Sequence, residues 1–139
     1  MNKFTFELFD DEETGLLKSI CNKYNIIVPA ECQNINFTKS LEDVAHLADI
    51  ISKYQYRLAN INLYPKFWAL CNARKEQTII HEFLHIRICP MQDILKAMSN
   101  YIDNDSLKEY VQGDSTYASE FVVEGMTQMV YSIMNKELL

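Results

Sequence analysis

His81-Glu82-Phe83-Leu84-His85 is the stretch that decides how the rest of the chain is interpreted, since it holds two of the three histidines in 139 residues. Residues four apart on a helix share one face, with Cβ atoms about 5–6 Å apart. Two imidazoles placed in this way can bind one Zn²⁺ at Zn–N distances of about 2.0–2.1 Å. Glu82 lies about 100° around the helix from His81, where a carboxylate can act as general base on a water held at the ion.

The helix that carries this pentapeptide is predicted to be buried. Its remaining positions are mostly apolar, namely Ile79, Ile80, Phe83, Leu84 and Ile86. We expect the helix to begin near Asn72 and to end at Cys89, because a proline follows at position 90. Two imidazoles in a buried helix need polar partners, and a metal ion would supply one.

A zinc site also needs a third protein ligand and a position left open for water. Glu120 and Glu124 are four apart on a further predicted helix, beside an apolar face that we expect to be buried. That face consists of Ala118, Phe121, Val122, Met126, Met129 and Ile133. One glutamate would bind the ion and the other would accept the spare N–H of a ligating histidine. His46 is the alternative third ligand, and Gly125 would allow the two helices to approach closely.

The pattern H-E-x-x-H on one helix and E-x-x-x-E on a later one resembles the gluzincins, the group of thermolysin-like zinc peptidases. The stretches 61–68, 76–91 and 120–126 are also similar to small metallopeptidase-like proteins of phages and mobile elements, and the resemblance covers roughly residues 56–134. It implies one Zn²⁺ on His81, His85 and Glu120, with Glu82 as the general base and Glu124 supporting a histidine. Glu124 departs from the aspartate that is more common in gluzincins.

The resemblance implies hydrolysis of a peptide bond, in which Glu82 transfers the proton of a zinc-activated water. Candidate donors to the oxyanion are Tyr110, Tyr117, Arg87 and His46, and the sequence does not choose among them. Arg87 stands where relatives often carry a further histidine. The stretch 57–64 would be an edge strand that pairs with an extended substrate, which places Asn60 and Asn62 at that edge.

Two other functions remain open at this point. The chain could be a catalytically silent, zinc-stabilised interaction module, for example a phage or mobile-element regulator that binds a repressor or host factor. An acidic surface and an exposed strand edge would suit a protein partner. A helical interaction protein without metal is the third possibility, and it predicts no stoichiometric zinc.

Periodicity predicts one helix-rich α+β domain over residues 1–139, with about five helices and two or three short strands, and the resemblance makes the fold zincin-like. A helix near 10–24 follows from the possible N-caps Asp10 and Asp11. Gly113-Asp114-Ser115 is expected to break the chain before the last helix. The remaining helices are expected near 41–53, 72–89, 91–102 and 116–136, and the strands near 3–9, 34–37 and 57–64.

Composition narrows the class of partner and the compartment. With 13 basic and 19 acidic residues, the formal charge is −6, which disfavours a nucleic-acid partner. No apolar run approaches the roughly 18 residues of a membrane span, and the first residues do not resemble a secretory signal. Four widely spaced cysteines suit a reducing compartment, so we expect a cytoplasmic protein acting on a protein or peptide. The sequence does not indicate the oligomeric state.

Overall fold

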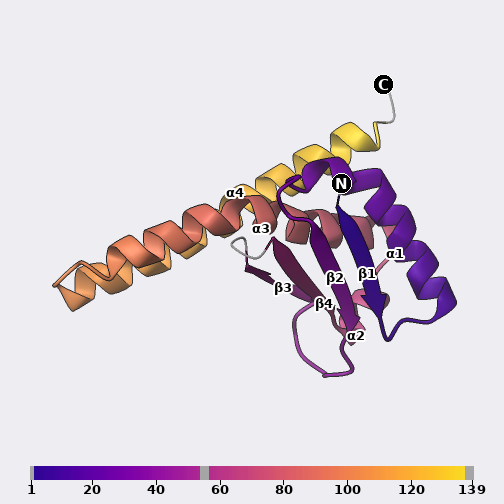
Figure 1. Cartoon of the computed structure of the whole chain (residues 1–139), viewed down its shortest axis with the longest axis horizontal. Coiled ribbons are helices and arrows are strands. Elements are labelled where there is room, and N and C mark those ends of the chain that lie inside the picture. The colour runs from indigo at the N-terminus through magenta and orange to yellow at the C-terminus, as the bar shows by residue number, and fades with distance from the viewer. Residues whose placement is uncertain (1, 54–56, 137–139) are drawn as a thin grey trace.

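The computed structural model describes residues 2–53 and 57–136, and over these ranges it contains one small sheet and four α-helices (Figure 1). This confirms a helix-rich α+β fold, with four strands where two or three were expected. The elements in chain order are β1 (Lys3–Glu7), α1 (Asp11–Tyr24), the 3-10 helix η1 (Asn25–Ile27), β2 (Asn34–Lys39), β3 (Ala48–Lys53), β4 (Leu58–Leu63), α2 (Pro65–Trp68), α3 (Asn72–Ser99) and α4 (Asp105–Met134).

The sheet has the order β1-β2-β4-β3. The pairs β1·β2 and β2·β4 are parallel, and β3 is antiparallel to β4, with Ile50 opposite Ile61. The strand predicted at 57–64 therefore exists as β4, but it pairs on both sides and is not an edge strand. Asn60 and Asn62 lie inside the sheet, and the free edge next to β4 belongs to β3.

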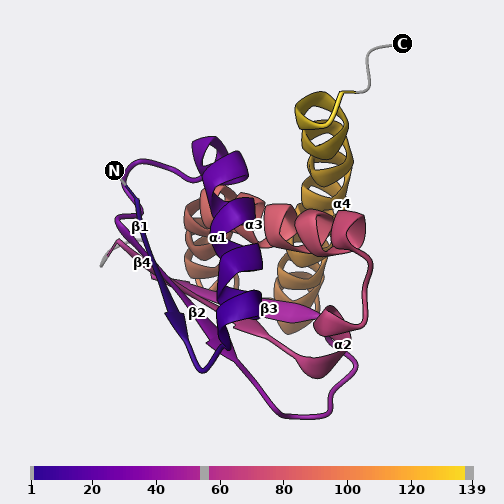
Figure 2. The same ribbon diagram turned by 90° about the vertical axis from the view of Figure 1, so that its right-hand side faces the viewer.

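One face of the sheet is buried beneath α1 and α3 (Figure 2). Apolar inward positions alternate with polar outward ones along β1, along β2 and along β4 from Ala59 onward, as the two-residue period of a half-buried strand requires. Asn36, Asn60 and Asn62 therefore face the opposite, open side. The buried positions of the core include Leu17 and Ile20 of α1, Ile35 and Phe37 of β2, Ala59, Ile61 and Leu63 of β4, and Ile80 and Phe83 of α3.

The helix predicted at 41–53 is wrong. Ser40 does accept a hydrogen bond from the backbone N–H of Glu42, at 3.2 Å, but this local turn does not continue as a helix. Residues 48–53 instead pair with β4 as strand β3. The neighbouring Ile50 and Ile51 are β-branched, which favours a strand.

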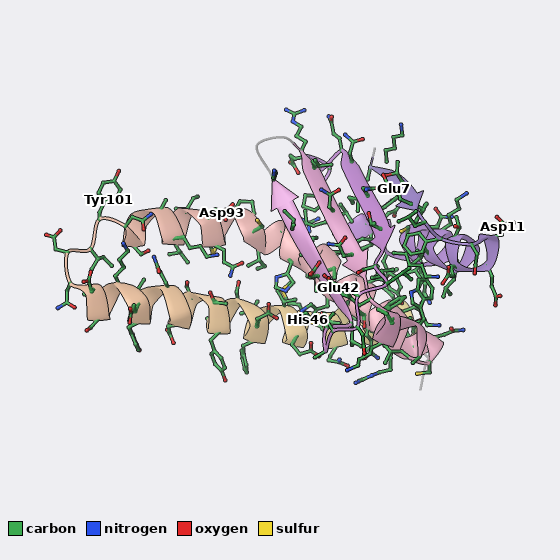
Figure 3. All side chains as sticks on the ribbon, turned by 90° about the horizontal axis from the view of Figure 1, so that it is seen from below. Glu7, Asp11, Glu42, His46, Asp93 and Tyr101 are labelled. Atoms are coloured by element: carbon green, nitrogen blue, oxygen red, sulfur yellow. The ribbon has the colours of Figure 1, made fainter. Side chains whose placement is uncertain are left out.

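The predicted breaks at Pro90 and Gly113 are also wrong, because α3 and α4 each run straight through them. Pro90 has no N–H to donate to the carbonyl of Ile86, yet α3 continues to Ser99. At that end, the side-chain amide of Gln112 in α4 donates to the hydroxyl of Ser99 at 2.7 Å. The two helices form a long antiparallel pair. Its distal part, residues 91–116, projects beyond the sheet and is called the arm (Figures 1 and 3).

The end of α4 is attached to the end of α1. The side-chain amide of Asn135 donates to the Tyr24 hydroxyl at 2.6 Å, and Lys23 donates to the amide oxygen of Asn135. Asp10 and Glu13 form a capping box at the start of α1, so the expected N-cap at Asp10 is confirmed. Among the described residues, neither of the long helices nor any shorter one has the apolar length needed to cross a bilayer.

Candidate metal centre

His81 and His85 lie on the same face of α3. Their Nε2 atoms are 3.1 Å apart. The opposite side of this helix packs on the sheet through side chains such as Ile80 and Phe83, which are fully buried. Burial of that apolar side turns both imidazoles toward α4.

Glu120 of α4 reaches both histidines. One carboxylate oxygen is 3.0 Å from Nε2 of His85, and the other is 3.3 Å from Nε2 of His81. Ligands of a tetrahedral zinc ion at about 2.0–2.1 Å are separated from one another by about 3.3 Å. The donor set of two imidazoles and one carboxylate is also one that zinc prefers. The residues therefore fit a zinc ion, and ligand atoms of all three lie within 4.8 Å of one another.

Glu124 contacts the other nitrogen of His81. Its carboxylate lies 3.2 Å from Nδ1, and its second oxygen accepts a hydrogen bond from Gln128 at 3.2 Å. A carboxylate at Nδ1 favours the tautomer that carries its proton there. The lone pair of Nε2 is then directed at the side where Glu120 and His85 converge.

Glu82 is the buried acid of the site, with only 6% of its surface exposed. Burial, followed by the charges of Glu120 and Asp49, raises the pKa of Glu82 to about 8. Burial also lowers the pKa of His85, although the charge of Glu120 opposes that shift. A lowered histidine pKa favours the neutral imidazole, which is the form that binds a metal.

A cavity of about 450 Å³ lies between the three convergent residues and strand β3. Its walls include His81, Glu82, His85 and Glu120 on one side and Ala48, Ile50 and Ser52 on the other. A second cavity of about 290 Å³ adjoins His81, Glu82 and Glu124. His46 lines both cavities from the loop before β3, where its ring lies 6.1 Å from that of Tyr64. It is outside the convergent group.

Other residues singled out from the sequence are not brought to these cavities. Tyr110 and Tyr117 are 67% and 73% exposed on the outer side of α4. Arg87 donates to the backbone carbonyl of Ile27 and lines a separate cavity of about 560 Å³. Asn60 lies on the open side of the sheet, and Asn62 there donates to Asp49 at 2.9 Å.

The face of α4 that was expected to be buried is exposed, and this expectation is wrong. Phe121, Met129 and Ile133 are all more than half exposed, whereas the buried positions are Ser119, Val123 and Thr127. The carboxylates can face the histidines only if this narrower face, with its smaller side chains, packs on α3. Gly125 does not mark the contact between the helices, because a Cβ at this position would meet nothing within 4 Å.

Sequence reasoning missed the contribution of β3 and Asp49. Asp49 accepts hydrogen bonds from Asn62 and from the Tyr64 hydroxyl, and it lines the larger cavity. The pair Ile50-Ile51 was the available signal for a strand, but the serine and acidic residues at 40–43 imitate a helix start.

The chain was compared with known proteins at three levels. No protein-family model, no curated protein and no solved structure matches it.

Proposed function

We propose that this chain is a zinc-dependent peptidase that hydrolyses a peptide bond in an extended protein or peptide segment, within the cytoplasm. One observation carries the proposal. The Nε2 atoms of His81 and His85 and the carboxylate of Glu120 converge with separations of 3.0–3.3 Å, next to the buried carboxyl of Glu82. Four free cysteines suit the proposed reducing compartment.

Each residue of the site has a part in the proposed reaction. His81, His85 and Glu120 would hold the ion, which when bound supplies positive charge that polarises the scissile carbonyl and favours ionised water and an ionised Glu82. Glu82 would accept the proton of the attacking water and return it to the nitrogen of the leaving chain. Glu124 would hold His81 in the required tautomer through Nδ1.

The substrate would lie along β3. This strand is at the end of the sheet order, and it faces α3 across the cavity that contains Glu82. An extended peptide can add to a free strand edge through main-chain hydrogen bonds, which do not depend on its sequence. In this arrangement the backbone of β3 takes the role that was predicted for the edge at Asn60 and Asn62.

Metal analysis of the purified chain tests the ligands. We expect about one zinc per chain in the wild type and a large loss in both His81→Ala and Glu120→Ala. Glu109→Gln, which changes an exposed carboxylate in the arm, is the matched control and should keep its zinc. Zinc retained in Glu120→Ala would contradict the third ligand and favour Glu124 or His46.

Activity on unfolded protein and on internally quenched peptides tests the reaction. Glu82→Gln should keep its zinc and lose hydrolysis, since the amide cannot accept the proton. Loss of zinc in this variant would make Glu82 structural. A zinc-loaded wild type that cleaves none of these substrates would favour the second candidate, a zinc-stabilised interaction module. The exposed apolar side chains of α4 are the observation in favour of that candidate.

A further inference from the structure

The free edge of β3 presents main-chain groups to the cavity beside the histidines. The carbonyl of Leu47, just before β3, accepts a hydrogen bond at 3.1 Å from the backbone N–H of the residue that follows β4. Main-chain groups of successive strand residues point to opposite sides, so those of Ala48, Ile50 and Ser52 point away from β4. The thiol of Cys89 donates to the Ser52 carbonyl at 3.6 Å, which agrees with this direction. The same three residues of β3 line the cavity of about 450 Å³.

The cavities of about 450 and 290 Å³, called the larger and the smaller cavity, meet beside the proposed metal ligands. Both are lined by His46, Ala48, His81 and Glu82. The larger cavity follows β3 as far as Ser52, whereas the smaller one lies at the start of the strand, near the His46 label of Figure 3. If the scissile bond lies beside Glu82, a peptide paired with β3 fills the larger cavity on one side of that bond and enters the smaller cavity on the other.

Arg74 brings a positive charge to the smaller cavity. Among the described residues, no other lysine or arginine lines either cavity. Arg74 lies two turns before His81 on the same side of α3, about 10 Å along the helix axis. Its backbone carbonyl accepts a hydrogen bond from Thr78, but within residues 2–53 and 57–136 its guanidinium has no ion pair or hydrogen bond. A guanidinium offers paired donors that match the two oxygens of a carboxylate.

The acidic residues around the two cavities leave the charge of Arg74 available for a ligand. Glu124 lines the smaller cavity as well, but its two oxygens contact Nδ1 of His81 and the side-chain amide of Gln128. The larger cavity has acidic residues such as Asp49 in its wall and no lysine or arginine among its described lining residues. A carboxylate of the substrate is therefore favoured in the smaller cavity and disfavoured in the larger one.

The charge of Arg74 also favours one direction of the peptide. β3 runs from the smaller cavity toward Ser52, so an antiparallel peptide places the segment after its scissile bond in the smaller cavity. Antiparallel pairing is slightly more stable per residue than parallel pairing. A parallel peptide would bring its N-terminal side to Arg74, and a terminal ammonium there would be repelled.

We propose that Arg74 binds a carboxylate of the substrate on the C-terminal side of the scissile bond, an assignment that rests on the proposed peptidase function. The carboxylate belongs to the C-terminus of the peptide or to an acidic side chain close to the cut. The edge of β3 holds the other side of the peptide through main-chain groups and does not select its sequence. Selection by charge is thus confined to the smaller cavity.

Binding of fluorescein-labelled peptides to the zinc-loaded Glu82→Gln variant tests the carboxylate, because this variant should hold a peptide without cleaving it. The peptides are rich in threonine, which favours an extended chain, and they form two pairs. The first pair compares a C-terminal acid with its amide, and the second compares amides that end in two glutamates or two glutamines. Fluorescence anisotropy should give a dissociation constant about tenfold lower for the acidic member of at least one pair. Equal dissociation constants within both pairs, or no binding of any peptide, would overturn the proposal.

Variants of Arg74 in the same background test the residue. Arg74→Gln should abolish the preference for the acidic peptide, whereas the matched control Arg57→Gln removes the same group from the separate cavity of about 560 Å³ and should retain it. Arg74→Glu should instead prefer amides that end in two lysines, a reversal that loss of the fold would not produce. A preference that survives in Arg74→Gln would overturn the proposal. A preference for glutamates at the N-terminal end would do the same, because it would show parallel binding.

Cleavage by the wild type separates this proposal from the peptidase function. In the Glu82 form of the enzyme, Arg74→Gln should lower kcat/KM about tenfold for the preferred acidic peptide and leave its neutral counterpart unchanged. A wild type that binds acidic peptides through Arg74 but cleaves none would support the carboxylate site and contradict the peptidase. Cleavage of acidic and neutral peptides with equal kcat/KM would support the peptidase and contradict the role of Arg74.

Discussion

The rest of the described chain, residues 2–53, 57–90 and 117–136, is called the body. The body and the arm share one helix, α3, but its two halves have opposite surroundings. Apolar positions recur along α3 every three or four residues, from Ile80 to Met98. In the body, Ile80 and Leu84 are 0% and 2% exposed, whereas Met91, Ile94 and Met98 in the arm are 65%, 54% and 63% exposed. The same spacing of apolar residues therefore occurs both where other elements cover α3 and where its side chains are exposed. A helical apolar pattern predicts the helix, but it does not show what covers the pattern.

The largest expected difference between the two halves is in the cost of removing a side chain. Leu84→Ala should lower the free energy of unfolding by about 2–5 kcal/mol, because it leaves a cavity in the core. Met98→Ala removes an exposed side chain and should change it by less than about 0.5 kcal/mol. Urea unfolding of both variants measures the difference. Equal losses would show that the arm is as well covered in solution as the body.

Zinc should stabilise the junction between body and arm, where α3 and α4 hold the proposed ligands. At a free concentration of 100 times the dissociation constant, the ion should raise the free energy of unfolding by about 2.7 kcal/mol. Glu120→Gln should remove this gain, whereas Glu109→Gln in the arm should retain it. Thermal unfolding with and without zinc measures the effect. A gain that survives in Glu120→Gln would place the bound ion elsewhere.

Pro90→Ala should make α3 more stable where it leaves the sheet. Proline is about 3 kcal/mol less favourable than alanine inside a helix, and the looser unfolded chain of the variant offsets part of that difference. We therefore expect a gain of about 2 kcal/mol in urea unfolding. Amide exchange should slow on both sides of position 90. A destabilised variant would show that the fold requires the contacts of the proline ring at position 90.

The smallest expected difference in stability between the body and the arm comes from replacing one glycine in each. A Cβ at Gly15 in α1 or at Gly113 in the arm would meet nothing within 4 Å. Each change to alanine should stabilise its helix by up to about 1 kcal/mol. Gly15→Ala should raise the free energy of global unfolding, while Gly113→Ala should slow amide exchange in the arm alone. Equal effects on global unfolding would mean that the arm and the body unfold as one unit.

The elements that were predicted correctly are those in which the local sequence pattern and the contacts with the rest of the fold favour the same structure. The capping box at Asp10 and Glu13 begins α1 as expected, and the alternation around Ile61 predicted strand β4. For the site, the four-residue spacings placed the two histidines on one helix face and Glu120 and Glu124 on another, and the resemblance to the gluzincin pattern led to the prediction that the two pairs meet. Helical geometry alone determines both spacings.

The remaining elements depend on contacts between distant segments. Residues 48–53 form β3 because they pair with β4. The local turn at Ser40 and the acidic residues after it resembles the start of a helix, and it misled the prediction. Packing between α3 and α4 keeps both helices continuous at Pro90 and at Gly113. On α4 the face with Ser119, Val123 and Thr127 packs on α3, whereas hydrophobicity alone favours the opposite face.

The attachment of Asn135 to Tyr24 also affects the order of folding during synthesis. Tyr24 leaves the ribosome early, but its partner is 111 residues further along the chain. The parallel pairing of β1 with β2 involves only residues up to position 39, with α1 as the crossover between the strands. The convergence of Glu120 with the histidines must wait for nearly the whole chain. In a nascent chain, all strand segments of the sheet are therefore present before Glu120 can reach the histidines.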